Sequence, residues 1–169
     1  PRHSFDEGID YRQEIGMYLR GGAIVAINLR YQNLEVFPEE ICDIDTLELL
    51  DISGNKFESL PVQIGQLGQL KELLADENAI EALPLSISDL SMLKRLSLDN
   101  NKLKLIPEKL GLLPLEKLYV HNNQLERVPD NLWQLKALRV LSLGSNPIGN
   151  IGEAIGQLQQ LEELYLHDM

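Results

Sequence analysis

The sequence predicts an α/β solenoid, in which the chain winds through one short strand and one turn per repeat. Three observations predict it. The pattern L-x-x-L-x-L-x-x-N-x-L recurs along the 169 residues, its copies start 22 or 23 residues apart, and a proline follows the asparagine position in most copies. A period of this length is typical of stacked units, each of which buries its apolar face only against its neighbours.

The copies keep one register from residue 24 onward. Counted from the first apolar position, they start at Ile24, Leu47, Leu70, Leu93, Leu115, Leu138 and Leu161. The spacing is 23 residues except between Leu93 and Leu115, where it is 22. We therefore expect six full repeats and a truncated seventh over residues 24–169.

Each copy has a strand part and a turn part. The last two leucines of L-x-x-L-x-L, such as Leu96 and Leu98, are two residues apart, which is the period of a strand with one buried face. At the ninth position of the repeat, most copies have an asparagine, whose amide can satisfy backbone groups where the chain leaves the strand. We therefore expect a stack of Asn55, Asn78, Asn101, Asn123 and Asn146. The prolines then oppose regular pairing on the convex side, where we expect short helical or 3₁₀ turns.

Residues 1–23 precede the repeats and differ from them. Ser4-Phe5-Asp6-Glu7 fits a capping box, and Gly21-Gly22 offers a helix stop. Apolar residues recur between them at loosely helical spacing, at Ile9, Ile15, Tyr18 and Leu19. The segment is predicted to be an N-terminal helical cap, since solenoids need polar end units. Four acidic residues disfavour the alternative of a membrane-surface helix.

The pattern resembles the leucine-rich repeat family. The segment Leu60-Pro61-Val62-Gln63-Ile64-Gly65 is similar to the L-P-x-x-I-G type of 23-residue repeat, which occurs in Ras-suppressor-like scaffolds and small bacterial leucine-rich repeat proteins. The resemblance covers Ile24 to the C-terminus. It implies a horseshoe with a concave parallel sheet and a non-catalytic role as a protein-protein interaction scaffold.

Composition restricts the function classes. Fifteen basic and 26 acidic residues give a formal net charge of −11, which opposes nucleic acid binding and favours a basic or mixed-charge protein partner. No apolar run approaches the roughly 18 residues of a membrane span. The single cysteine, Cys42, excludes intramolecular disulfides and favours a cytoplasmic location.

No catalytic motif is present. Gly21-Gly22 lacks the lysine and spacing of a phosphate loop, and the sequence contains no G-x-S-x-G, C-x-x-C or H-E-x-x-H. We therefore expect neither an enzyme nor a cofactor. Asp99 and His121 are suitable metal ligands in neighbouring repeats. His167 is expected about 10 Å from His121, two strand spacings away, so no shared metal site is expected.

The residues between the strand leucines point outward from the concave sheet and form the predicted binding face. Equivalent positions of adjacent repeats lie about 4.7–4.9 Å apart, so the acidic residues form one area beside three exposed apolar anchors, Leu49, Leu74 and Tyr119. Exposed anchors rimmed by charge are typical of interfaces, although isolated surface leucines are also common. The predicted partner-binding residues are Leu49, Asp51, Glu72, Leu74, Asp76, Glu77, Asp99, Tyr119 and His121.

Two other functions remain open at this stage. The resemblance also implies that the chain could be the recognition segment of a larger multidomain enzyme with a GTPase, kinase or ubiquitin-ligase domain. A bacterial surface protein is the third alternative. The truncated seventh repeat leaves an unpaired strand at the C-terminal edge, through which we expect self-association.

Overall fold

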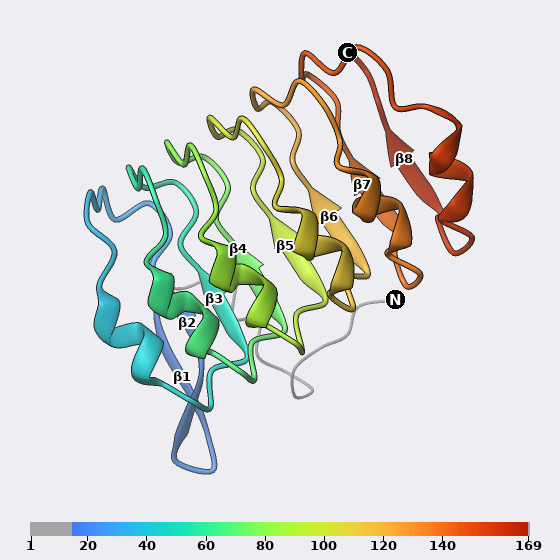
Figure 1. The fold of residues 1–169 in the computed structure, drawn as a ribbon. Coiled ribbons are helices and arrows are strands. Elements are labelled where there is room, and N and C mark those ends of the chain that lie inside the picture. The colour runs from blue at the N-terminus through green and yellow to red at the C-terminus, as the bar shows by residue number, and fades with distance from the viewer. Residues whose placement is uncertain (1–14, 169) are drawn as a thin grey trace.

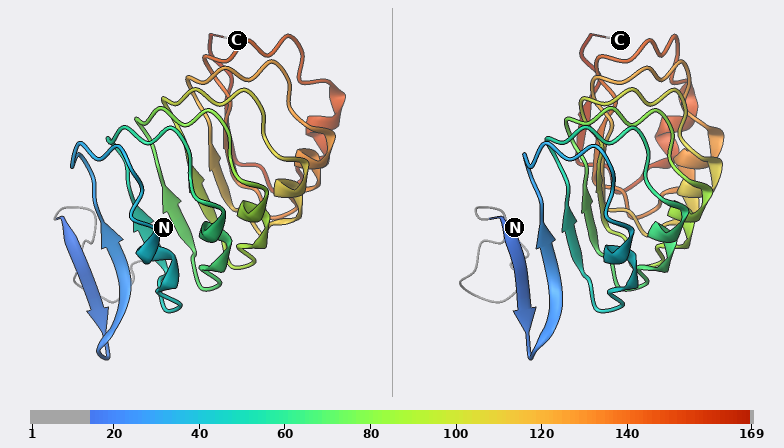
Figure 2. Two further views of the ribbon diagram at one scale, coloured as in Figure 1. Left: turned by 60° about the vertical axis from the view of Figure 1, so that its left-hand side comes forward. Right: turned by 90° about the vertical axis from the view of Figure 1, so that its left-hand side faces the viewer.

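The computed structural model describes residues 15–168, which form one eight-stranded sheet with its strands in chain order, β1 to β8. The repeats stack side by side, with the sheet along one side of the stack and the short helices along the other (Figures 1 and 2). The sequence prediction of a repeat solenoid is therefore confirmed. No helix among the described residues is both long and apolar enough to cross a membrane.

The seven repeat strands are short and parallel, and each pairs in register with the next. They are β2 (Ala23–Asn28), β3 (Leu49–Asp51), β4 (Glu72–Leu74), β5 (Arg95–Ser97), β6 (Lys117–Tyr119), β7 (Val140–Ser142) and β8 (Glu163–Tyr165). In-register pairing follows from the repeat, because a slip of one residue would turn every buried leucine to the other face.

The leucine positions of the repeats form one continuous core. Leu96, Leu118 and Leu141 are completely buried between neighbouring repeats, whereas Leu164 in the last described strand is 39% exposed. The same residue type in the same position is therefore buried only where a neighbouring repeat covers it. Self-association through this edge stays a prediction.

The asparagines form the expected ladder at the ends of the strands. The amide group of Asn101 donates to the carbonyls of Ala75 and Leu98 at 2.9 and 3.1 Å, and its oxygen accepts from the Ile80 backbone N–H at 3.0 Å. One side chain thus satisfies backbone groups in two adjacent repeats. The same pattern of donation and acceptance recurs at Asn55, Asn78, Asn123 and Asn146.

The outer side consists of six 3₁₀ helices, as expected for turns that begin after a proline. They are η1 (Glu39–Asp43), η2 (Val62–Gln66), η3 (Leu85–Asp89), η4 (Glu108–Leu112), η5 (Asp130–Gln134) and η6 (Glu153–Gln157). Proline precedes the first five, and Gly152 takes its place before η6. Their buried residues, such as Ile64 and Ile87, close the core from this side.

The predicted N-terminal helical cap is wrong where it can be compared with the structure. Gly16–Arg20 forms the strand β1, which pairs antiparallel with β2. Gly21 and Gly22, with φ of 60° and 85°, make a two-residue hairpin turn rather than a helix stop. Tyr18 of β1 packs against Ala26 and Leu49, whereas Ile15, Met17 and Leu19, which alternate with it, are exposed. The proposed capping box lies outside the described residues.

Candidate partner-binding face

Each repeat presents side chains in alternation on the face of the sheet that points away from the core, the concave face of the sequence prediction. In β6 these are Lys117 and Tyr119, followed by His121 two residues later. Because the strands pair in register, side chains at equivalent positions lie side by side across the repeats. The candidate site is therefore a set of rows that run across the strands.

Two of the three predicted apolar anchors are not exposed. Leu49 and Leu74 are only 2% and 6% exposed, so the prediction that they are surface anchors is wrong. Leu49 packs with Ala26, and Tyr18 of β1 lies against both. For Leu49 the sequence prediction failed because it expected a helix in place of β1, the strand that brings Tyr18 onto this face.

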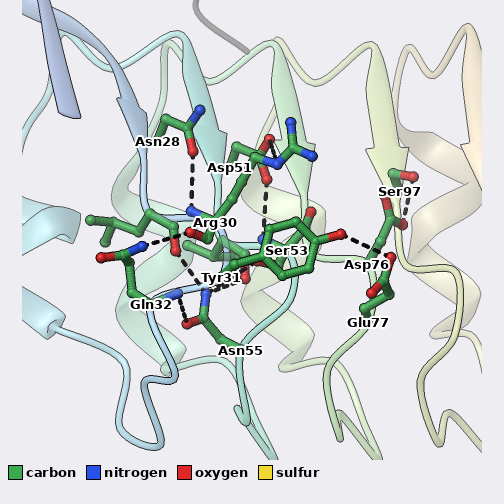
Figure 3. A network of polar contacts seen from close by, with 12 residues as sticks. Asn28, Arg30, Tyr31, Gln32, Asp51, Ser53, Asn55, Asp76, Glu77 and Ser97 are labelled. Atoms are coloured by element: carbon green, nitrogen blue, oxygen red, sulfur yellow. Dashed lines mark hydrogen bonds and ion pairs between the residues drawn. The ribbon is translucent and has the colours of Figure 1, made fainter. Parts of the chain in front are cut away.

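Asp51 is also buried, at 2% exposure, and is not available to a partner. One carboxylate oxygen accepts the backbone N–H of Ser53 at 3.1 Å, and the other lies 3.7 Å from Nε of Arg30. These contacts are part of the polar network at the N-terminal end of the face (Figure 3). The role of Asp51 is therefore to hold the first repeats together.

Asp76 and Asp99 are half-buried and connect successive repeats. Oδ1 of Asp76 accepts from the Ser97 hydroxyl at 2.7 Å and from the Asp99 backbone N–H at 2.8 Å, and Oδ1 of Asp99 accepts from the His121 N–H at 2.6 Å. Burial raises the pKa of Asp99 to about 6, against the opposing effect of its hydrogen bond, and burial also raises the pKa of Asp76. The predicted acidic area exists, and burial opposes the charged form of both of these carboxylates.

Arg95 lies among these acidic residues. Its guanidinium is 3.9 Å from the half-buried Glu72 and 5.3 Å from the ring centroid of Tyr119. Its Nε is buried without a hydrogen-bond partner. The face therefore has mixed charge, because Arg95 lies near both the acidic Glu72 and the ring of Tyr119.

Glu77 is exposed at the edge of the face and takes part in a contact that spans three repeats. The ring of Tyr31 lies over Gly54, and its hydroxyl donates to Oε1 of Glu77 at 3.1 Å (Figure 3). A Cβ at Gly54 would lie 2.1 Å from Cδ1 of this ring, so only glycine leaves room for it. We call this Tyr31–Gly54–Glu77 contact the tyrosine clasp.

His121 and His167 make a second contact across a glycine. Their ring centroids are 4.9 Å apart, so the expected separation of about 10 Å is wrong for the side chains. The expectation used the backbone spacing of two strands, whereas Gly144 lies between the histidines and leaves room for the rings to lean together. We call this contact the histidine pair. Nδ1 of His121 is buried without a hydrogen-bond partner, and residues 15–168 contain no group of three potential metal ligands.

The predicted partner-binding residues left out two aromatic residues of the face. Tyr165 is 43% exposed and occupies in β8 the position of Tyr119 in β6, and His167 is exposed two residues later. The signal was available in the repeat alignment, where Tyr119, Ser142 and Tyr165 are equivalent. It was overlooked because the acidic residues were taken as the centre of the site.

Comparison with known proteins identifies the repeat. Two family models, both described as leucine-rich repeat, match residues 114–168 in one case and residues 46–67 and 92–113 in the other. Comparison with curated proteins gave no match.

Solved structures agree with the family matches. A leucine-rich repeat protein of Leptospira interrogans is 32% identical over 82% of this chain and 41% of its own, with a TM-score of 0.66. The Arabidopsis receptor kinase HAESA, in complex with the peptide hormone IDA and the co-receptor SERK1, is 27% identical over 91% of this chain and 28% of its own, with a TM-score of 0.83. The plant peptide hormone receptor RGFR1, in complex with RGF2, is 26% identical over 77% of this chain and 22% of its own, with a TM-score of 0.70.

This chain thus spans less than half the length of each of these proteins. The repeat period, the asparagine ladder, the family models and the structural neighbours all indicate the same conclusion. The chain belongs to the leucine-rich repeat family.

Proposed function

We propose that this chain is a non-catalytic interaction module that binds a protein or peptide of basic or mixed charge on its concave face. The observation that carries the proposal is the row of polar side chains along the ends of the strands, one repeat after another. It contains Asp76, Glu77, Asp99, Asn100, His121, Asn122, His167 and Asp168, all exposed or half-buried. Such a row fits an extended chain that crosses several strands.

The row is also held rigidly, which favours binding because little freedom is lost when a partner docks. Asp76 and Asp99 accept hydrogen bonds from the next repeat, and the asparagine ladder fixes the backbone beneath them. The formal net charge of −11 supports a basic or mixed-charge partner. Two neighbouring structures are complexes with the peptides IDA and RGF2, which supports binding of a peptide segment here.

The structure changes how this proposal is best tested. Charge reversal at Asp76 and Asp99 would also break the hydrogen bonds they accept from the next repeat. The better variant is Asp76→Asn with Asp99→Asn, which removes both charges and keeps an oxygen acceptor at each position. We expect capture of the main partner by the immobilised protein to fall about tenfold, the effect of about 1.4 kcal/mol, with an unchanged circular dichroism spectrum.

The matched control lies away from this face. Glu81 is exposed, pairs with Lys104 at 2.8 Å, and carries the same formal charge. Glu81→Lys is expected to leave capture unchanged. Equal capture by the parent and by the double asparagine variant would move the binding site away from Asp76 and Asp99.

The second candidate function is the recognition segment of a larger enzyme. It is favoured by the match to a receptor kinase of which this chain spans 28%. The test is to sequence the gene on both sides of the region that encodes these residues. A reading frame that holds no further domain would exclude this candidate and leave the interaction module.

A further inference from the structure

The histidine pair lies on the concave face near the C-terminal end of the sheet. His121 follows β6 and His167 follows β8, while Gly144 follows β7 between them (Figure 1). The ring centroids are 4.9 Å apart and the ring planes are tilted by 40°. The sequence prediction excluded a shared metal site on a separation of about 10 Å, and the observed ring distance removes that reason.

The distance between the rings is compatible with two imidazoles on one metal ion. Zinc–nitrogen bonds are about 2.0–2.1 Å long, so two imidazole rings bound to one tetrahedral zinc ion have their centroids about 5 Å apart. Aromatic rings in ordinary contact also lie about 4.5–7 Å apart. The distance therefore permits a metal site, and a further observation has to distinguish it from a simple ring contact.

The Nδ1 atom of His121 provides that observation. It is buried and has no hydrogen-bond partner among the described residues. A buried polar atom in a native protein nearly always has a partner, which can be an ion. A ring contact with His167 leaves Nδ1 unsatisfied, whereas a metal ion would use its lone pair, because the neutral imidazole is a common ligand of transition metals.

The small residue Gly144 brings the two side chains to the same point. A Cβ on Gly144 would lie 3.3 Å from Nδ1 of His121 and 3.3 Å from Cε1 of His167. Cε1 is bonded to both ring nitrogens of His167, and this side chain is exposed, so a turn of the ring brings one nitrogen toward Nδ1. The backbone here is fixed, since the Asn122 N–H donates to the Gly144 carbonyl at 3.0 Å and the Ser145 N–H to the His167 carbonyl at 2.9 Å.

Negative charge beside the pair favours a cation. The half-buried carboxylate of Asp99 accepts the backbone N–H of His121 at 2.6 Å, and the exposed Asp168 follows His167 in the chain. The formal net charge of −11 acts in the same direction over longer distances. No third ligand joins the two histidines among residues 15–168, so water would complete the coordination.

We propose that the histidine pair binds a divalent transition-metal ion such as Zn²⁺, with Nδ1 of His121 and one ring nitrogen of His167 as its protein ligands. Imidazole suits zinc, copper, iron and nickel, whereas magnesium and calcium prefer oxygen ligands. The site goes beyond the proposed binding of a protein partner, and its test needs no partner.

The first experiment is isothermal titration calorimetry of the full chain with Zn²⁺ at pH 7.5, with Mg²⁺ as the control cation. We expect the pair to bind Zn²⁺ and to give no heat of binding with Mg²⁺. Nuclear magnetic resonance of the chain with its histidine rings isotopically labelled identifies the ligands, because the ring nitrogen signals of His121 and His167 should change together. A change at only one of the two rings, or equal binding of Mg²⁺, would overturn the inference.

Two variants test the ligands one at a time. His121→Ala and His167→Ala are each expected to weaken Zn²⁺ binding by at least about tenfold, since loss of even a residue that only supports a ligand costs roughly 10–100-fold. His3→Ala, which removes the third histidine of the chain, is the matched control and should bind Zn²⁺ like the parent. Unchanged binding in His167→Ala, or an equal loss in His3→Ala, would assign the ion to another position and overturn the inference.

Thermal unfolding distinguishes a site built by the fold from binding to a single histidine. The two ligands are close only in the folded chain, so saturating Zn²⁺ should raise the unfolding temperature of the parent. His167→Ala removes an exposed side chain, so its circular dichroism spectrum should match that of the parent, but it should gain no stability from Zn²⁺. A parent whose unfolding temperature is the same with and without Zn²⁺ would contradict a shared site.

Discussion

The two ends of the concave face use the same device with different results. In the tyrosine clasp, Tyr31 lies over Gly54 and reaches Glu77 two repeats away. In the histidine pair, His121 leans across Gly144 to His167, also two repeats away. The clasp ends in a hydrogen bond, whereas the pair ends in a ring contact and leaves Nδ1 of His121 without a partner.

The surroundings of the two contacts differ in exposure. Around the clasp, the side chains of Asp51 and Asn28 are buried and satisfy neighbouring backbone groups. Around the histidine pair, Tyr165 and His167 are exposed. The first repeats thus use their polar side chains to stabilise the fold, whereas the last repeats expose aromatic side chains.

The largest effect is expected from the asparagine ladder that supports both contacts. Asn101→Ala would leave the buried N–H of Ile80 without an acceptor and would remove one of the hydrogen bonds to each of the carbonyls of Ala75 and Leu98, which keep bonds from Asn78 and Asn123. At 1–3 kcal/mol for the unsatisfied N–H and about 1 kcal/mol for each lost bond, we expect the free energy of unfolding to fall by about 3–5 kcal/mol. Urea denaturation measures it. Gln124→Ala, which removes an exposed amide next to the ladder position of Asn123, is the control, and an equal loss there would contradict a special role for the ladder.

The two glycines should differ in cost. A Cβ at Gly144 would lie 2.7 Å from the backbone carbonyl of His167, which cannot move without displacing β8. We expect Gly144→Ala to lower the free energy of unfolding by about 2–3 kcal/mol, the upper part of the range for overpacked cores. At Gly54 the conflict is with the Tyr31 ring, which can swing outward, so the φ of +69° dominates and costs about 1–2 kcal/mol.

Thermal unfolding of both glycine variants tests this order. A larger loss in Gly54→Ala would mean that the clasp holds the first repeats more tightly than the histidine pair holds the last. The comparison between the two ends would then be reversed.

Most of the fold could be predicted from the repeat, because one pattern determines the strand, the asparagine turn and the 3₁₀ helix of most copies. The N-terminal segment has no copies to compare, and five residues of β1 fit helical spacing almost as well as alternation. The candidate site was harder to predict. The row positions of Asp76, Glu77 and Tyr119 followed from the repeat, but the burial of Leu49 depends on Tyr18 of β1, which no pattern in the repeats encodes.

The ring positions of the histidine pair could not be predicted from the sequence for a related reason. Backbone spacing gives the distance between strands, whereas ring positions depend on what fills the gap. Gly144 appears in the sequence as one variable residue, and its consequence follows only when the two neighbouring rings are considered together. The cytoplasmic location stays a prediction.

The smallest effect compares Asp51 and Asp99, two carboxylates of this face. Asp99 has a pKa raised from 3.8 to about 6, mainly by burial, with Asp76, His121 and Arg95 facing it. A raised pKa in the folded state means that its contribution to stability is fully present below about pH 4 and is lost as the pH rises through about 6. Asp99→Asn is neutral throughout and keeps an acceptor for the His121 N–H. Compared with the parent, we expect it to be equally stable at pH 4 and about 1 kcal/mol more stable at pH 7.5, a value reduced from the full shift because water still screens the group.

Asp51→Asn should act in the opposite direction at pH 7.5, because Asp51 is buried beside Arg30 and its loss leaves that charge without this carboxylate. Urea denaturation of both variants at the two pH values measures these differences. Stabilisation by Asp51→Asn would show that the carboxylate of Asp51 is no better paired than that of Asp99.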